Sequence, residues 1–377
     1  MNLNHIPILD HHAHPLLRPE AIQTAVSFQQ WFTESTHPAT HQHHVPHSLF
    51  FRTGIKWLAE LLGCEATITA VLAARAAIPY TQWSHRLFND ANISMVLCDY
   101  GYSTADSYTP ATFPALLPCP VHPILRLETY FQELIVVHSN FDDAIEAFIA
   151  TLRQARADGY VALKSIIAYR SGLDIAPADR AGAEAAYNSL HAEAQRNGRV
   201  RLAAKPLCDY LLWLAAEEAA RQELPLQIHT GFGDEDADLR TANPLHLRPL
   251  IAQTKANLVL LHIGWPFSRE TAHLAALYPN VWLDLSLAIP FATTGIPALL
   301  REVLGMAHHS KILFATDAFT MPDIFWLAAR WGRWGLGRVL DELISEGFLS
   351  AREAEETAVS ILHRNAQTLY PISKGIN

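Results

Sequence analysis

The chain has 377 residues, a size that fits two average domains or one large α/β barrel with an insertion. Its composition is 50% hydrophobic and 17% charged, which is typical of a globular protein and excludes a largely disordered chain. The net charge of −9 argues against nucleic acid or an anionic membrane as the main partner. An anionic small molecule stays compatible with this charge, because a bound metal ion would dominate the local field.

The N-terminus lacks the basic start and apolar core of a signal peptide, and the sequence has no apolar run long enough to span a bilayer. We therefore expect a cytoplasmic protein whose partner is a small-molecule substrate. A homo-oligomer is compatible with the sequence, since metal-binding barrels of this size are often dimers or larger.

Eight short apolar runs, rich in β-branched residues, predict buried strands. They are Ile6–Asp10, Ile93–Asp99, Ile124–Glu128, Val161–Ile166, Leu224–His229, Leu258–His262, Val281–Leu285 and Ile312–Thr316. Most are continuous rather than alternating, as in parallel sheets that are covered on both faces. Helical patterns separate most of them, for example Phe141–Ala157, Ala181–Gln195, Leu211–Gln222 and Pro244–Thr254.

This alternation predicts that residues 1–377 form one α/β domain, a (β/α)8 TIM barrel. A doubly wound open sheet is the alternative. Such a sheet more often has a glycine-rich phosphate loop after its first strand, whereas the turn after Asp10 is rich in histidine.

The stretch between the first two strands is too long for one helical crossover. It holds three helical patterns, Ala21–Phe32, Leu49–Leu62 and Thr67–Ile78. We expect residues from about 18 to 90 to form an inserted helical cap over the barrel mouth. Five histidines in it lack regular ligand spacing and predict a polar surface loop, from which a few could reach the site: His37, His41, His43, His44 and His47.

The C-terminal end of the chain predicts one more helix. Ser350 and Glu353 fit a capping box at its start, and the helical pattern continues to about Leu369. Pro371 and Gly375 then predict a frayed tail.

Side chains that could bind a metal ion follow or end the predicted strands. They are His12, His14, Lys164, His229, His262 and Asp317. An extended backbone sends alternate side chains to one face, so His12 and His14 should point together and could bind one ion. Each histidine alone is weak evidence, but active sites of such barrels lie at the C-terminal ends of the strands, where the whole set falls.

Several segments resemble the amidohydrolase superfamily, and within it the amidohydrolase-related branch of TIM-barrel metal-dependent hydrolases. The chain is most similar in character to the domain fused to glutamine-synthetase-like proteins in the nodulin group. The segments that carry the resemblance are Asp10–Pro15, Leu163–Ser165 with Ala168–Leu173, Gln227–Asp234, Leu261–Gly264, Ala315–Ala318 and Asn365–Tyr370.

The resemblance implies roles for the candidate ligands. His12, His14, His229 and Asp317 would hold the ion, and His262 would bind a second metal or polarise the substrate. Lys164 lies where binuclear members carry a carbamylated lysine that bridges two metals; an unmodified lysine would instead pair with an acidic neighbour or a substrate carboxylate. One or two divalent ions are expected, zinc first and manganese or iron next.

The chemistry follows from such a centre. A divalent ion lowers the pKa of water from about 15.7 to roughly 7, so water becomes a nucleophile at neutral pH. Asp317 would accept the proton and pass it to the leaving group, and His262 or the ion would stabilise the oxyanion.

Contacts with substrate are expected from three residues outside the ligand set. Arg170, after the fourth strand, could clamp a carboxylate, although a structural salt bridge is an equal alternative. Asp234 could bind an amine or shape its loop, and Trp265 could pack on substrate. Arg126 and Glu128 point the same way on the third predicted strand and are expected to pair with each other, and Asp284 on the seventh fits a structural hydrogen-bond acceptor better than a ligand.

The leading functional hypothesis is a metal-dependent hydrolase that acts on the C–N bond of a small, carboxylate-bearing amide. A decarboxylase or a uronate-type isomerase on the same barrel is the alternative, favoured if the centre holds one metal and Lys164 is unmodified. A non-catalytic binding domain is a third possibility, against which the costly cluster of buried polar groups argues.

Overall fold

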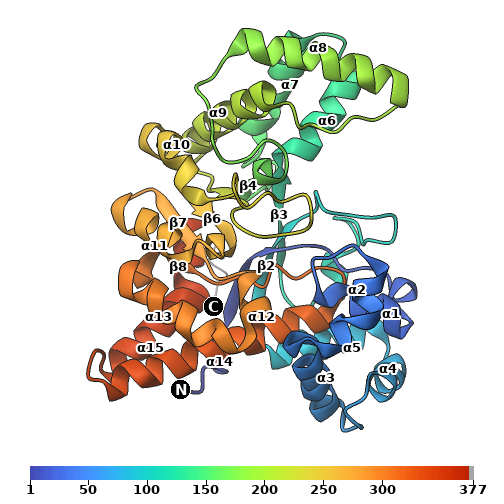
Figure 1. Ribbon diagram of the computed structural model, residues 1–377, viewed down its shortest axis with the longest axis vertical. Coiled ribbons are helices and arrows are strands. Elements are labelled where there is room, and N and C mark those ends of the chain that lie inside the picture. The colour runs from blue at the N-terminus through green and yellow to red at the C-terminus, as the bar shows by residue number, and fades with distance from the viewer. Residues whose placement is uncertain (373–377) are drawn as a thin grey trace.

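The computed structural model describes residues 1–372 and consists of one parallel sheet surrounded by helices (Figure 1). The strands are β1 (Ile8–Ala13), β2 (Ile93–Asp99), β3 (Val121–Arg126), β4 (Ala162–Ser165), β5 (Leu226–Ile228), β6 (Leu258–Leu260), β7 (Val281–Asp284) and β8 (Ile312–Leu313). They pair in chain order from β1 to β8, and all seven neighbouring pairs are parallel.

The sheet nearly closes on itself through the segment that follows β8. The backbone N–H of Asp317 donates to the carbonyl of His12 at 3.0 Å, and that of His14 donates to the carbonyl of Ala318 at 2.8 Å. These bonds place the end of β1 beside residues 317–318. The architecture is therefore the predicted (β/α)8 TIM barrel, and its carboxyl-terminal edge brings the first and last candidate ligands together.

Helices connect the strands and cover the outside of the barrel (Figure 1). They are α1 (Ala25–Gln29), α2 (Pro38–His43), α3 (Leu49–Leu62), α4 (Ile68–Ala76), α5 (Tyr80–Asp90), α6 (Leu127–Val137), α7 (Phe141–Gln154), α8 (Arg180–Asn197), α9 (Lys205–Gln222), α10 (Arg248–Gln253), α11 (Ser268–Leu277), α12 (Ala288–Ala292), α13 (Ile296–Met306), α14 (Pro322–Ser345), α15 (Ala351–Val359) and α16 (Asn365–Leu369). Within residues 1–372, no helix combines the length and the hydropathy that crossing a membrane requires.

Shorter turns of helix complete the connections. The 3-10 turns are Pro19–Ile22, Gln30–Phe32, Val45–His47, Pro114–Leu116, Ile167–Tyr169, Pro244–Leu247, Leu261–Gly264, Thr293–Gly295 and His309–Lys311, and Ser360–Arg364 forms a π-helical turn.

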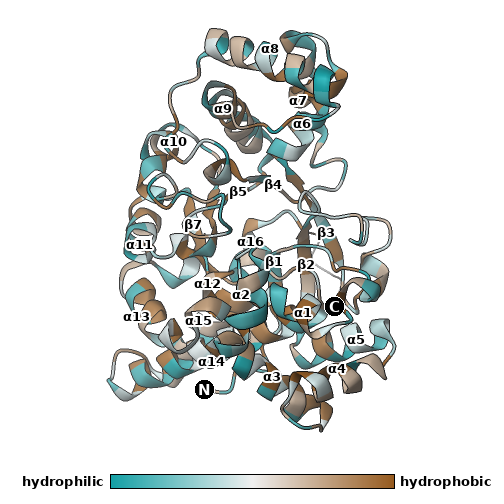
Figure 2. Cartoon of the chain, turned by 45° about the vertical axis from the view of Figure 1, so that its right-hand side comes forward, coloured by the Kyte–Doolittle hydropathy of each residue, from teal (hydrophilic) through white to brown (hydrophobic). Residues whose placement is uncertain are grey.

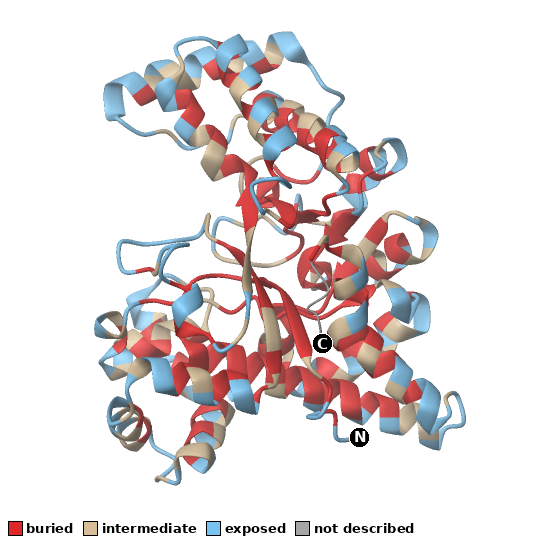
Figure 3. Cartoon of the chain, turned by 180° about the vertical axis from the view of Figure 1, so that it is seen from behind, coloured by how far each residue is buried: buried red, intermediate tan, exposed pale blue. Residues whose placement is uncertain are grey.

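The strands are buried on both faces, as their continuous apolar sequences predict (Figures 2 and 3). Leu9, Leu97, Val259 and Leu313 belong to a core inside the barrel, together with Tyr370 from the C-terminal segment. A larger core fills the space between the outer barrel surface and the helices. Burying a leucine side chain contributes roughly 1.5–3 kcal/mol, so these two layers supply the main stabilisation of the barrel.

The predicted strand positions are confirmed, but several bounds are not. The third strand begins at Val121 and ends at Arg126, and Glu128 belongs to α6 instead. Strands β5, β6 and β8 stop before the candidate ligands, which occupy irregular turns. His262 and Asp317 have φ angles of 66° and 49°, so regular strand geometry could not continue through either residue.

Helices α1–α5 lie between β1 and β2, where the sequence predicts helical segments. The expectation of one helix over Ala21–Phe32 is wrong, because Thr24 forms a capping box with Ser27 and starts α1 separately from the preceding 3-10 turn. The expectation of a histidine-rich loop is also wrong. Pro38 starts α2 in that region, and a 3-10 turn with Pro46 follows it.

The C-terminal helical prediction is confirmed with one refinement. The Ser350–Glu353 capping box starts α15, and the helical path reaches Leu369 through the π-helical turn and α16. Pro371 follows one residue after the helix, behind the C-cap Tyr370, as expected for a helix end, whereas Gly375 lies outside the described residues.

Candidate metal centre

A β-bulge in β1 decides which histidines enter the barrel. Asp10 pairs with Val96 and Ala13 with Cys98, so β1 advances three residues while β2 advances two. The extra residue reverses the alternation of side chains between His11 and His12. As a result His11, His12 and His14 all have contacts within the barrel interior or mouth.

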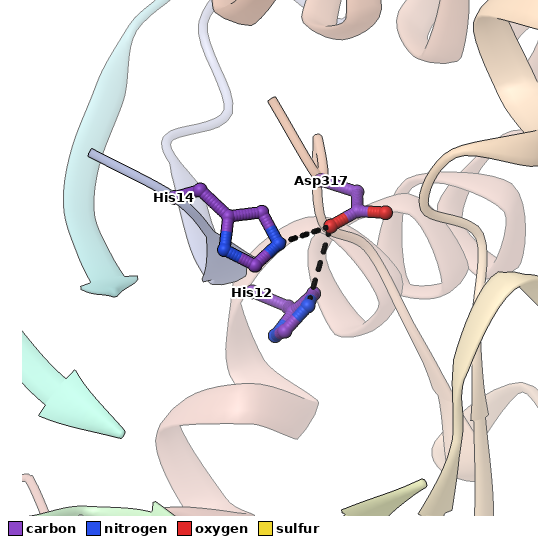
Figure 4. A group of neighbouring side chains, drawn as sticks. All are labelled: His12, His14 and Asp317. Carbon is purple, nitrogen blue, oxygen red and sulfur yellow. Dashed lines mark ion pairs between the residues drawn. The ribbon is translucent and has the colours of Figure 1, made fainter. Parts of the chain in front are cut away.

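His12, His14 and Asp317 form a compact group in which each residue offers one ligand atom, all within 4.8 Å of one another (Figure 4). Oδ1 of Asp317 lies 3.2 Å from Nε2 of His12 and 3.3 Å from Nε2 of His14. All three residues are buried. The expectation that His12 and His14 point together toward one site is therefore confirmed.

The orientation of His14 suits a cation at this position. Its Nδ1 lies 2.9 Å from the carbonyl oxygen of Asp99, which can only accept, so Nδ1 carries the proton. In a neutral ring, Nε2 then presents a lone pair toward the carboxylate of Asp317. Two facing acceptors repel each other, and a cation between them would turn that repulsion into ligation. A carbonyl that orients a ligating histidine in this way is a common feature of metal sites.

His262 and His229 form a second layer beside this group. Nδ1 of His262 lies 3.5 Å from Oδ2 of Asp317 and 2.8 Å from Oγ of Ser286, while its Nε2 lies 2.9 Å from Nδ1 of His229. Nε2 of His229 must donate to the carbonyl of Phe232, at 3.0 Å. Nδ1 of His229 consequently accepts from His262, so both of its nitrogens are engaged in this conformation.

Burial favours the neutral form of three histidines of the site, His12, His229 and His262. It lowers the pKa of His12 to about 3, with Lys164 adding to the effect, and lowers the pKa of His262 to about 4. The pKa of His229 is also well below its ordinary value, again mainly because of burial. Burial would raise the pKa of Asp317, but His262 and His12 outweigh it and lower that pKa well below the ordinary value. Neutral imidazoles and an ionised carboxylate are the forms that bind divalent metals.

Lys164 is fully buried at the end of β4, with Nζ 3.4 Å from Nε2 of His12. Burial lowers the pKa of its ammonium group from 10.5 to about 8, although Asp317 and Asp99 counteract the effect. A lysine with this pKa has a substantial neutral fraction at physiological pH, which is the form able to react with carbon dioxide.

The candidate ligands lie in a cavity of about 480 Å³, within the range of small-molecule sites. Its walls combine strand ends with residues from the segment between β1 and β2. The lining residues include His12, His14, Lys164, His229, His262, Asp317, Arg126, Tyr169, Arg170, Arg201, Asp234, Tyr102, Phe319, Trp31, Glu34 and His41.

Two of the three expected substrate contacts line the cavity. Arg170 is partly buried, and its Nε has no hydrogen-bond partner among the described residues. Asp234 is partly buried and accepts from the backbone N–H of Asp236, so it also shapes its own loop. Trp265 is not among the lining residues; its ring lies 4.8 Å from that of Phe232 in an edge-to-face contact.

The expected pairing of Arg126 with Glu128 is wrong. Arg126 donates two hydrogen bonds to Oδ2 of Asp99, at 2.8 and 2.6 Å, because β2 and β3 are adjacent. Glu128 accepts from the hydroxyl of Ser165 at 2.6 Å and from the backbone of residue 166. Each arrangement satisfies a buried charge with a partner on a neighbouring strand.

Asp284 is a structural acceptor, as expected. Its Oδ1 accepts from the backbone N–H of His262 at 2.5 Å, and Oδ2 lies 3.2 Å from Nε2 of His11. Nδ1 of His11 then lies 2.9 Å from the hydroxyl of Tyr370, which also accepts a hydrogen bond from Gln227. This chain of contacts connects the C-terminal segment with the turn that presents His262.

Two residues near the site were not predicted from the sequence. His11 was missed because strict alternation points it away from His12 and His14, and no sequence signal identifies the bulge. Glu34 was missed because it lies in an irregular stretch without a motif. His41 was expected in a surface loop from which a few histidines could reach the site; it is buried, lines the cavity, and its Nε2 lies 2.6 Å from the carbonyl of Ser35.

Comparison with known proteins identifies the family of this chain. The amidohydrolase family matches residues 133–372, more than half of the sequence. The chain belongs to the amidohydrolase family. The protein fluG of Emericella nidulans is 36% identical over 237 residues, which make up 60% of this chain but 27% of fluG. This amidohydrolase therefore spans little more than a quarter of that relative.

Solved structures agree with the family. A proposed metal-dependent hydrolase from Lactobacillus casei is 29% identical and superposes with a TM-score of 0.88, covering 97% of this chain and 96% of the other. A uronate isomerase from Thermotoga maritima has a TM-score of 0.63 at 13% identity, covering 97% and 95% of the two chains, and shows that the fold is shared. The chain is thus an enzyme of the amidohydrolase family with a metal-dependent hydrolase as a structural neighbour.

Proposed function

We propose that this amidohydrolase is a metal-dependent hydrolase that cleaves the C–N bond of a small, carboxylate-bearing amide. The observation that carries the proposal is the buried group of His12, His14 and Asp317 inside a cavity of about 480 Å³. Its two imidazoles and one carboxylate match the ligand preferences of zinc, with manganese or iron as further candidates.

We assign the metal-holding role to His12, His14, His229 and Asp317. His229 fits this role if its ring releases the carbonyl of Phe232 or the ring of His262 when an ion binds. His262 is assigned to the oxyanion or to a second ion, and Lys164 to a bridging position as a carbamate. When bound, a divalent ion would lower the pKa of water to about 7 and polarise the scissile carbonyl.

The residues of the chain would carry out the proton transfers. Asp317 is ionised at neutral pH because His262 and His12 lower its pKa despite its burial, so it can accept a proton from water. In the same position it can return that proton to the leaving nitrogen as a general acid. His262 is held by Asp284 and Ser286, and a ring N–H released from His229 would donate to the developing charge on the substrate oxygen.

Arg170 is assigned to the carboxylate of the substrate. It lines the cavity, and the described residues include no acidic side chain within ion-pair distance of its guanidinium. A guanidinium can bind a carboxylate with two parallel hydrogen bonds, which would fix the orientation of the amide above the metal group. Trp265 is assigned an indirect role, since it supports Phe232 rather than lining the cavity.

Residues from about 18 to 90 are proposed to act as a cap on the barrel mouth. Part of this segment, including Trp31, Glu34 and His41, contributes to the wall of the cavity. A cap of this kind would exclude water and add substrate contacts that the barrel itself lacks.

The test is metal content per chain by inductively coupled plasma mass spectrometry, on wild type and Lys164→Ala produced with bicarbonate. The exposed Lys56→Ala serves as the matched control. About two ions in wild type and Lys56→Ala, falling to one or none in Lys164→Ala, would support a carbamate-bridged hydrolase, and amide libraries would identify its substrates.

Other outcomes redirect or overturn the proposal. One ion in all three proteins would exclude a bridging role for Lys164. It would also favour a decarboxylase or a uronate-type isomerase over the hydrolase. Carbon dioxide release from an acid without net water consumption would then identify the decarboxylase. Absence of metal from all three proteins would overturn the metal-dependent mechanism.

A further inference from the structure

One part of the cavity wall takes no part in the proposed hydrolysis. It is formed by residues 30–36, between α1 and α2, and includes the carboxyl group of Glu34. Oε1 of Glu34 is shielded from solvent and has no hydrogen-bond partner among the described residues. A shielded carboxyl oxygen without a partner is costly, so a ligand that donates a hydrogen bond to Oε1 would lower the free energy of the site.

Aromatic rings line the same cavity as this carboxyl group. Trp31 lies 5.6 Å from Phe319 and Phe319 lies 5.8 Å from Tyr102, both in edge-to-face geometry. Tyr102 in turn lies 5.5 Å from the ring of His14, so the aromatic wall reaches the metal group. All three of these aromatic residues line the cavity. Aromatic faces attract cations, most strongly where water is excluded.

Apart from Arg170, which is assigned to the substrate carboxylate, the arginine and lysine side chains of the cavity have other neighbours. Arg126 is paired with Asp99 at 2.6 Å, and Arg201 is paired with Asp236 at 2.8 Å. Lys164 lies beside His12 at the metal group. Within residues 1–372, Glu34 has no cationic side chain within ion-pair distance, so the positive charge that would complement it is absent from this wall.

We propose that Glu34 and the aromatic residues Trp31, Tyr102 and Phe319 form a subsite for a protonated amine carried by the substrate. The ammonium group would donate to Oε1 of Glu34, and its carbon substituents would pack on the aromatic rings. The inference rests on the proposed function in one respect: the amine belongs to the molecule that the metal centre hydrolyses. This subsite would narrow the proposed substrates to amides that carry a separate cationic amine.

The protonation of Glu34 agrees with such a subsite. Burial, followed by the negative charges of Asp317 and Asp234, raises the pKa of Glu34 to about 8. The negative charges of Asp317 and Asp234 that contribute to this shift also attract a cation, and above about pH 8 the Glu34 carboxyl is ionised and can pair with an ammonium group.

The test measures binding of n-butylammonium to the metal-free protein at pH 8, by saturation-transfer NMR and calorimetry, with n-butanol as the neutral probe. Wild type is compared with Glu34→Gln, which keeps the shape of the side chain, and with the exposed control Glu20→Gln from the same segment. We expect n-butylammonium to bind about tenfold more weakly to Glu34→Gln than to wild type, since hydrogen bonds to charged groups contribute about that much. Glu20→Gln should bind like wild type, and n-butanol should bind equally to all three proteins.

The subsite is overturned if wild type does not bind n-butylammonium more tightly than n-butanol, or if Glu34→Gln binds it as wild type does. This outcome is separable from failure of the hydrolase, because the binding test contains no metal and measures no turnover. Amide hydrolysis without n-butylammonium binding would reject the subsite alone. Specific n-butylammonium binding by a protein that takes up no metal would reject the hydrolase alone.

Discussion

Two parts of the chain are rich in histidine, and the structure uses them in opposite ways. The first, residues 10–15 of β1 and the turn after it, buries His11, His12 and His14 around the barrel mouth. The second, residues 37–47, has five histidines, of which His41 is buried and the other four are exposed. Abundance of imidazole therefore does not make a metal site; its placement relative to a carboxylate does.

The backbone explains the difference. Side chains two apart on an extended strand share a face, so His12 and His14 converge on the same oxygen of Asp317. In α2 and the following turn, His41 and His43 are also two apart, but on a helix that spacing turns them away from each other. His37 lies 3.5 Å from the carboxylate of Glu235, but both side chains are exposed, so this contact does not form a buried site.

The largest expected effect comes from the carboxylate that unites the first region. Asp317→Asn keeps the size of the side chain but removes its ability to take a proton, and general acid–base catalysis contributes about 10²–10⁴-fold. We expect amide hydrolysis to fall by about a thousandfold, measured as kcat/KM on the amide found by library screening. The Asp317→Asn protein should still bind metal, with an affinity equal to or somewhat weaker than that of wild type. Hydrolysis at the wild-type rate would remove Asp317 from the proton pathway.

A smaller effect is expected on metal affinity. His12→Ala removes a proposed ligand, and since loss of a residue that merely orients a ligand already costs 10–100-fold, we expect affinity to fall by more than about 100-fold. The control is a triple variant in the second region, His43→Ala, His44→Ala and His47→Ala, which should bind metal like wild type. Competition with a chelator measures the metal affinity of His12→Ala and of the triple variant. Weaker binding in the triple variant would show that the second region also ligates.

The smallest expected effect is a pH dependence of folding in the metal-free protein. Burial lowers the pKa of His12 to about 3 and that of His262 to about 4 in the folded state, against 6.5 as the ordinary value. At these two residues the unfolded chain therefore binds more protons than the folded chain between those values. Their contribution to stability is fully present above pH 6.5 and is lost as pH falls toward 4, with a slope of up to about 1.4 kcal/mol per pH unit for each residue.

Urea denaturation at pH 7, 6 and 5, with a chelator present, measures the total slope, to which Asp10 and Glu34 contribute in the opposite sense because burial raises their pKa values to about 7 and about 8. The histidine contribution is the difference between variants: stability of His262→Asn should fall less on acidification than that of wild type, because one buried imidazole is removed, whereas the triple variant of the second region should have the wild-type slope. An equal flattening by the triple variant would mean that exposed histidines control acid unfolding, contrary to the comparison.

The sequence alone determined the barrel and most of its centre. Continuous apolar strands such as β2 and β4 are recognisable locally, because burial on both faces requires apolar residues at every position. The ligand types are also local, since a barrel presents its chemistry at the ends of its strands. His12, His14, Asp317 and Lys164 were identified on that basis and lie together around the cavity.

Tertiary structure decided the features of the site that depend on residues far apart in the sequence. The bulge that lets both His11 and His12 face inward depends on pairing between β1 and β2, some 80 residues apart in the chain. Arg126 selects Asp99 rather than Glu128 because adjacent strands bring the two charges together before the next helix begins. Glu34 acquires its environment only when an irregular segment folds against the barrel mouth. Local patterns record the period of a strand or helix, whereas these contacts arise from registers and packing that no local pattern encodes.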